Sequence, residues 1–268
     1  MRLSITHRTT HSYDEPVSYG LQQIRMVPKS RGGQAIINWD ITLEGARREA
    51  TFDDQHNNVV WLTSMDEGAT EISLICQGEV ENTNGSGIIG THGGYAPLWY
   101  FGKTTRLTEP GNAVTRLADA VAKNSDHLDR LHSLSARIAS DVAYEVGSTG
   151  PNTSAEEALA GSRGVCQDHS HIMIAAARLL GHPARYVSGY LMMNDRIDQD
   201  ATHAWAEVHV EGIGWVGFDV SNGHSPDERY VRVATGLDYA EAAPISGLRV
   251  GSGATANETM RVSIQVQQ

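Results

Sequence analysis

The chain has few cysteines and no long apolar run, and both shortages limit what it can be. Only two of the 268 residues are cysteine, which argues against a disulfide framework. Cys76 stands in a strand-like run and is predicted to be a core residue that does not bond to Cys166. No stretch of about 18 apolar residues occurs, and Met-Arg-Leu-Ser-Ile-Thr-His-Arg at the N-terminus contains no apolar signal segment. We therefore expect no membrane partner and a cytoplasmic location, where a thiol stays reduced.

Basic residues are also scarce compared with acidic ones. Lys and Arg total 21 against 32 Asp and Glu, which gives a formal net charge of −11. The longest basic run is Arg47-Arg48, whereas nucleic-acid affinity depends on clustered Lys and Arg that neutralise phosphates. The composition therefore argues against a nucleic-acid partner, and we interpret the acidity as a solubility feature. It leaves the oligomeric state open.

Cys166 is the most informative residue that is present, in the sequence Gly-Val-Cys-Gln-Asp at positions 164–168. Apolar residues then recur at helical spacing before a Gly-Xaa-Pro stop signal, and they are Ile172, Ala175, Ala176, Leu179 and Leu180. This pattern predicts that Cys166 lies in the first turn of a buried helix. The unpaired N–H groups at a helix N-terminus favour a thiolate, the nucleophilic form of cysteine. The alternative, a small buried hydrophobic residue, is the commoner role of a free cysteine.

A histidine and an aspartate follow on two predicted strands. Residues 202–210 alternate in character, with His203 and Trp205 on one face, which is typical of a strand. Glu-Gly-Ile-Gly then predicts a hairpin turn, and the returning strand ends at Asp219. An antiparallel return of this kind can place a carboxylate beside an imidazole and fix its tautomer. The alternatives are a structural histidine and an aspartate that caps the following turn.

Together these motifs resemble the transglutaminase-like superfamily, a branch of the papain-like thiol enzymes. Gly-Val-Cys-Gln-Asp-His-Ser-His is similar to its cysteine motif, His-Ala-Trp-Ala-Glu-Val to its histidine strand, and Gly-Trp-Val-Gly-Phe-Asp-Val-Ser-Asn-Gly to its aspartate strand. Residues 1–80 and 238–247 resemble a bacterial subgroup described as transglutaminase-like enzymes or cysteine proteases. By this resemblance, Cys166, His203 and Asp219 match the nucleophile, the base and the residue that orients the base. Val-Ser directly after the aspartate departs from the Pro-Thr expected there, which affects only the local turn.

The resemblance implies acyl transfer through a cysteine thioester, with no cofactor and with a peptide or protein as substrate. Water as the acceptor would make the protein a cysteine protease or amidase, which the description of the subgroup favours. An amine as the acceptor would make it a transglutaminase, and a non-catalytic binding module on the same scaffold is a third reading. The backbone N–H of Cys166 is the natural first donor to the oxyanion. Tyr144, Gln167 and Trp205 are the candidates for substrate binding or a second donor, and the alternative for the aromatic residues is burial in the core.

The pattern of turns and periodic segments predicts an α+β fold. Short strands separated by turn signals predict a β-sandwich-like domain over residues 1–85. Gly, Asn, Ser and Thr are frequent in the segment that follows, so residues 86–111 are predicted to be a linker. Residues 112–268 are then the papain- or transglutaminase-like core, with helices packed on an antiparallel sheet and a helix that Asn112 caps.

Four other features are not assigned to catalysis or metal binding. The pattern His169-Ser-His171 puts the two imidazoles on different helix faces, and the acidic segment 194–200 has too few oxygen ligands in the right spacing for calcium. No metal site is therefore expected. Asp168 is interpreted as a favourable charge in the first helical turn. Glu207 is predicted to be a surface glutamate, although its place on the His203 face also permits a contact with that residue.

Overall fold

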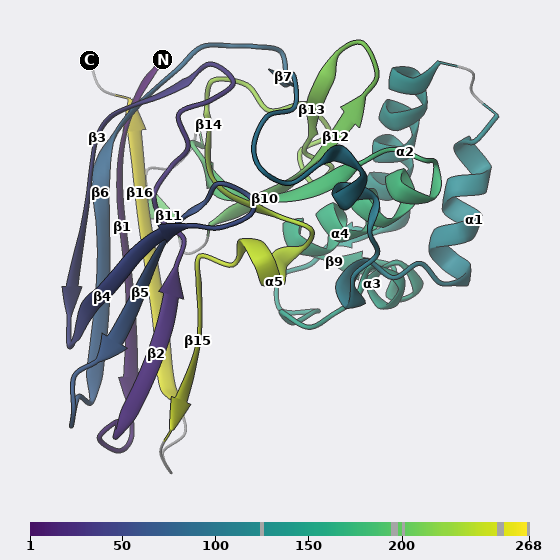
Figure 1. Cartoon of the computed structure of the whole chain (residues 1–268). Coiled ribbons are helices and arrows are strands. Elements are labelled where there is room, and N and C mark those ends of the chain that lie inside the picture. The colour runs from purple at the N-terminus through teal and green to yellow at the C-terminus, as the bar shows by residue number, and fades with distance from the viewer. Residues whose placement is uncertain (124–125, 194–197, 200–201, 251–254, 267–268) are drawn as a thin grey trace.

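Antiparallel sheets form the N-terminal part of the protein, and helices packed against a curled antiparallel sheet form the rest (Figure 1). This computed structural model describes residues 1–123, 126–193, 198–199, 202–250 and 255–266. The α+β fold class is therefore confirmed.

Two sheets face each other in the N-terminal part. The first has the strand order β11-β16-β1-β6-β3 and the second the order β15-β2-β5-β4. Their bounds are β1 Arg2–Tyr13, β2 Tyr19–Ile24, β3 Gln34–Glu44, β4 Ala46–Asp53, β5 Val59–Met65, β6 Glu71–Asn82, β11 Asp198–Gln199, β15 Ile245–Val250 and β16 Thr255–Val266. Alternate residues of β1 point inward, so Leu3 and Ile5 are fully buried against Cys76 of β6. The prediction that Cys76 is a core residue is confirmed.

Strand pairing in the sheets crosses the domain boundaries predicted from the sequence. The last strand, β16, pairs with β1 along nearly its whole length, so the two ends of the chain lie side by side (Figure 1). Strand β15 pairs in the same way with β2. The C-terminal residues of the predicted core thus belong to the N-terminal sheets, because strand edges pair by tertiary approach and not by order in the chain.

The segment 86–111 is packed into the structure and is no free linker. Its strand β7, Ile88–Gly90, pairs with β13, and two short 3₁₀ helices follow at Leu98–Gly102 and Arg106–Thr108. Phe101 is buried with its ring edge against Trp215, at a centroid distance of 5.1 Å. A buried aromatic pair of this kind fixes the segment on the sheet, despite its glycine-rich composition.

The second half of the chain builds a sheet with the order β14-β10-β12-β13-β7. The strands and helices are α1 Asn112–Val121, α2 His127–Asp141, β8 Ala143–Tyr144, α3 Ala155–Gly161, β9 Arg163–Gly164, α4 Cys166–Leu179, β10 Ala184–Leu191, β12 His203–Val210, β13 Gly214–Phe218, β14 Tyr230–Gly236 and α5 Tyr239–Ala242. Helix α4 packs on one face of this sheet through Ala204, Ala206 and Val208 of β12. The N-terminal sheets cover the opposite side (Figure 1), so the central strands are buried on both faces.

Local capping explains where the helices begin. Ser154 and Glu157 form the predicted capping box of α3. The cap predicted for α1 is wrong, because Gly111 is its N-cap and Asn112 is its first residue. The carboxylate of Glu156 on α3 accepts the free N–H groups of that first turn instead, and a tertiary contact therefore replaces the local cap. None of the helices in the described ranges is both long and apolar enough to span a membrane.

The pairing of β16 with β1 predicts that the last strand contributes to the stability of the whole protein. Ile264 lies opposite Ile5 and is buried, whereas its neighbour Gln265 is exposed. Ile264→Ala should lower the free energy of unfolding by about 2–5 kcal/mol, through lost burial and a cavity. Gln265→Ala, the matched control, should change it by less than about 0.5 kcal/mol in urea unfolding. If Ile264→Ala changed the free energy of unfolding as little as Gln265→Ala does, β16 would not be part of the cooperative core.

Candidate active site

Cys166 is the first residue of α4, as the sequence predicted. The carboxylate of Asp168 reaches back to accept the Val165 N–H at 2.8 Å and the Thr149 hydroxyl at 2.6 Å. A side chain at Gly164 would collide with this carboxylate, since an added Cβ would lie 2.7 Å from the Asp168 Cβ. Asp168 is therefore more than a favourable charge, because it holds the turn that presents the half-buried Cys166 at the start of the helix.

His203 and Asp219 are brought together by the predicted hairpin. His203 begins β12, and Asp219 directly follows β13, which pairs with β12 in antiparallel register. His203 Nε2 donates to Asp219 Oδ2 at 2.6 Å. Cys166 is near enough to the imidazole to raise its pKa together with Asp219. Since Nε2 is engaged by the carboxylate, Nδ1 is the nitrogen left for a contact with the thiol. The ring thus bridges Cys166 and Asp219.

Asp219 stays ionised although its surface is only 1% exposed. Burial by itself would raise the pKa of this carboxyl, but hydrogen bonds from His203, Asn222 and Tyr230 outweigh burial and lower it. The Tyr230 hydroxyl and the Asn222 amide both donate to Oδ2 at 2.7 Å. The turn after Asp219 is closed by a bridge to His224. Three side chains therefore hold this carboxylate in place, namely those of His203, Asn222 and Tyr230.

The charge on His203 follows from its two partners. Burial would lower the pKa of the imidazole, but the hydrogen bond and charge of Asp219, together with the neighbouring Cys166, raise it to about 10. The ring is therefore a cation at neutral pH, held between the carboxylate and the sulfur. A thiolate beside an imidazolium is the resting form of an activated cysteine nucleophile.

Tyr144 is the one predicted accessory residue that reaches the thiol. Strand β8, which contains it, pairs in parallel with Arg163–Gly164 just before Cys166. The Tyr144 hydroxyl lies beside the side chain and the backbone of Cys166, and both affect its pKa. Burial, together with the charges of Cys166 and Asp219, raises the pKa of Tyr144 to about 12. The hydroxyl thus stays protonated and can donate at neutral pH.

The side chain of Gln167 is directed at a neighbouring loop, and that of Trp205 is buried. The Gln167 carboxamide donates to the Pro151 carbonyl at 3.3 Å, so it is directed at the neighbouring loop. Trp205 is only 2% exposed and lies nearly parallel to the His203 ring at a centroid distance of 6.2 Å. It is a core residue behind the imidazole, which corresponds to the alternative reading of this residue.

Three polar residues near the site were not singled out by sequence reasoning. Tyr230 and Asn222 hold Asp219, and Ser221 hydrogen-bonds His169 of α4 at 2.9 Å. Ser221 is part of the Val-Ser pair that departs from the family pattern, so this pair ties the turn to the helix. The proximity of Asn222 to the aspartate in the chain could have signalled its role, whereas Tyr230 gave no signal because it comes from another strand.

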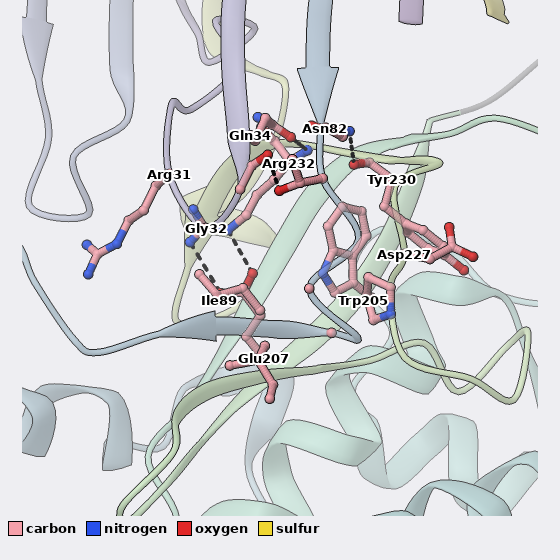
Figure 2. Close-up of a pocket in the computed structure, with 16 residues that line it drawn as sticks. Arg31, Gly32, Gln34, Asn82, Ile89, Trp205, Glu207, Asp227, Tyr230 and Arg232 are labelled. Atoms are coloured by element: carbon pink, nitrogen blue, oxygen red, sulfur yellow. Dashed lines mark hydrogen bonds and ion pairs between the residues drawn. The ribbon is translucent and has the colours of Figure 1, made fainter. Parts of the chain in front are cut away.

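The prediction that Glu207 is a surface residue is wrong. Its side chain is fully buried and receives Arg185 Nε at 2.6 Å and Arg232 Nε at 2.7 Å. The reason is the N-terminal sheet, which covers this face of β12. Figure 2 shows a small pocket at this boundary, of about 60 Å³, where Trp205, Tyr230 and Arg232 meet side chains of β3 and β6.

No cluster of three or more candidate metal ligands occurs in the part of the chain that the structure describes. The acidic segment 194–200, weighed above as a calcium loop, lies mostly outside the described residues. The candidate site therefore consists of a thiol, an imidazole, a carboxylate and a phenol.

A cysteine at a helix start, bridged by histidine to a buried aspartate on an antiparallel sheet, is the arrangement of papain-like thiol proteins. The model of the transglutaminase-like superfamily matches residues 114–220, and the bacterial transglutaminase-like N-terminal region matches residues 3–81. The chain belongs to the transglutaminase-like superfamily and carries the bacterial N-terminal region.

Relatives share the full length of the chain. An uncharacterised protein of Mycobacterium leprae is 28% identical over 267 residues, which cover 95% of each chain. An uncharacterised protein of Mycobacterium tuberculosis is 28% identical over 293 residues, covering 99% of this chain and 92% of the relative. Among solved structures, one from Cytophaga hutchinsonii named "a Putative Cysteine Protease" matches with a TM-score of 0.77 and 20% identity, covering 100% of this chain and 92% of that chain. This last likeness shows the fold.

Because the folded protein raises the pKa of His203, we predict that its free energy of unfolding depends on pH. In the unfolded chain the His203 pKa has its ordinary value of 6.5, and in the folded protein it is about 10. The stabilisation is therefore complete below pH 6.5 and is lost as the pH rises through about 10. Asp219→Asn removes the main anion beside His203, so its free energy of unfolding should lie below that of the wild type. The difference between the two proteins should shrink as the pH rises from 6.5 to about 10, by at most about 1.4 kcal/mol per pH unit. Urea unfolding at several pH values measures it, and a constant deficit would contradict the ion pair.

The pairing of Cys166 with His203 predicts the reactivity of the thiol. Iodoacetamide should alkylate Cys166 rapidly near neutral pH, and His203→Asn should remove this fast reaction. Cys76 is an internal control, because burial and the charge of Asp40 raise its pKa to about 12. Mass spectrometry of the two cysteine peptides gives both rates. Unchanged alkylation of Cys166 in His203→Asn would show that the imidazole does not activate it.

Proposed function

We propose that this protein is a cysteine protease or amidase that cleaves peptide or carboxamide bonds through a thioester on Cys166. One arrangement carries the proposal, namely the His203 ring hydrogen-bonded to Asp219 and placed next to the Cys166 side chain. A buried, ionised carboxylate that orients an imidazole beside a cysteine is typical of catalytic sites.

The geometry supports a two-step reaction. The Cys166 thiolate attacks the carbonyl carbon, a C–S bond forms, and the electron pair moves to the carbonyl oxygen. When this intermediate collapses, the C–N bond breaks and the leaving amine takes the Nδ1 proton of His203. Water then attacks the thioester and gives a proton to His203, the C–S bond breaks, and the acid leaves. Asp219 stays ionised throughout and stabilises the imidazolium.

The developing oxyanion has two donors within reach. The N–H of Cys166 belongs to the first turn of α4, where no carbonyl of the same helix can accept it. The Tyr144 hydroxyl already lies beside Cys166. A substrate oxygen that displaces this contact would receive both donors, and such donors typically contribute about 3–4 kcal/mol each to the transition state.

Transfer to an amine is the alternative outcome of the same thioester. The chemistry of attack is identical, and the two reactions differ only in the acceptor. The Cytophaga hutchinsonii protein that shares the fold is named "a Putative Cysteine Protease", and by that analogy we propose water as the acceptor.

Substitution of the nucleophile tests the proposal. A peptide library that includes glutamine-containing members is incubated with the wild type, with Cys166→Ala and with Cys76→Ala. Cys166→Ala should lose activity by about 10³-fold or more, because no thioester can form, while Cys76→Ala retains it. Mass spectrometry separates peptide-bond cleavage, deamidation of glutamine and, with an added primary amine, adduct formation. Turnover by Cys166→Ala at the wild-type rate would refute the mechanism, and amine adducts at the expense of hydrolysis would favour the transferase.

A further inference from the structure

A second cavity, lined by several basic side chains, lies away from Cys166, between the N-terminal sheets and the sheet that carries His203. Its volume is about 330 Å³. The loop after β2, the turn between β4 and β5, and strands β10 and β14 contribute its lining, and the residues that matter here are Lys29, Arg31, His56, Arg185 and Arg232. Four of these five carry a cationic group.

Three lining side chains have nitrogen atoms with unused hydrogen-bonding capacity. His56 is 7% exposed, Arg185 is 4% exposed and Arg232 is 6% exposed. His56 Nδ1, Arg185 Nη2 and Arg232 Nη1 are buried and have no hydrogen-bond partner among the described residues. Buried polar groups are almost always paired, so three such atoms around one cavity point to a ligand.

The cluster also has more positive than negative charge. Arg185 and Arg232 share the single carboxylate of Glu207. Lys29 adds a third basic group, which donates to the His56 carbonyl at 2.6 Å and to the Thr235 hydroxyl at 3.0 Å. Burial and the repulsion of Arg232 and Arg185 lower the Lys29 pKa well below its ordinary value, even though Asp54 and Glu207 oppose this. The excess charge therefore costs free energy that an anion would recover.

The nearby carboxylates do not neutralise the cavity. Asp54 is engaged by Arg25, with 3.3 Å between Nε and Oδ2. Glu241 accepts from the other nitrogen of His56 at 2.6 Å. Asp53, the one carboxylate in the lining, is exposed at the rim. Arg31 is turned away from Trp205 and Glu207 (Figure 2) and donates to the Gly93 carbonyl on the side of this cavity.

We propose that this cavity binds a small oxyanion, the phosphate or carboxylate group of a soluble molecule, on the guanidinium groups of Arg185 and Arg232. Planar guanidinium groups match the oxygen geometry of these anions, and His56 and Lys29 supply further contacts. The site is separate from the thiol. It shares strands with it, because Glu207 lies four residues beyond His203 on β12 and Arg232 two residues beyond Tyr230 on β14. An occupant would thus stiffen the strands that hold the base and the aspartate.

Titration with inorganic phosphate and, separately, with succinate tests the proposal. It also shows whether the cavity binds a phosphate or a carboxylate group more tightly. Phosphate should raise the melting temperature of the wild type above that in chloride at equal ionic strength. Lys29→Met should weaken phosphate binding by about tenfold or more in calorimetry, because one charge-assisted contact is lost. Lys123→Met, an exposed control on the end of α1, should bind like the wild type. Equal binding by Lys29→Met and Lys123→Met would overturn the proposal, since general salt effects act on both alike.

A measurement on the wild type keeps the test valid if Lys29→Met does not fold. Crystals soaked in tungstate, a heavy oxyanion, should show an anomalous peak within hydrogen-bonding distance of the Arg185 and Arg232 guanidinium groups. Peaks at other places only, or none, would overturn the site.

Discussion

The hydrogen bond between His203 and Asp219 is the constraint on which the rest of the site depends. It leaves one imidazole nitrogen to face Cys166, and with the thiol it keeps the ring charged. The carboxylate can do this while buried only because Tyr230 and Asn222 also donate to it. Strand β14 and the turn after β13 are thus as necessary to the base as the strand that carries it.

The sheet that carries His203 is buried on both of its faces. Helix α4 covers one face and delivers Cys166, while the N-terminal sheets cover the other. The second face buries charge, since Glu207 lies there between Arg185 and Arg232. By contrast, the cluster that contains Leu3, Ile5 and Cys76 is made of apolar side chains. The N-terminal part therefore covers the charged back of the His203 sheet, where Arg185 and Arg232 lie, and adds Lys29 to it.

Features that depend on short segments could be predicted from the sequence. The helix that begins at Cys166, the hairpin from His203 to Asp219 and the capping box at Ser154 all follow from local periodicity and turn chemistry. Features that depend on distant segments could not. The partner of Glu207, the cap of α1 and the pairing of the last strand each come from residues far away in the chain.

The sequence by itself determined the fold class, the family and the choice of Cys166, His203 and Asp219 as candidates, because each motif is read over a few adjacent residues. Only the tertiary structure decided that Tyr144 reaches Cys166, that Tyr230 holds Asp219, and that Trp205 is packed behind the base. It also placed the C-terminal strand in the N-terminal sheet and joined Lys29 to two arginines of the catalytic sheet. Burial and hydrogen-bond partners are properties of the packed chain, and residue type and spacing do not specify them.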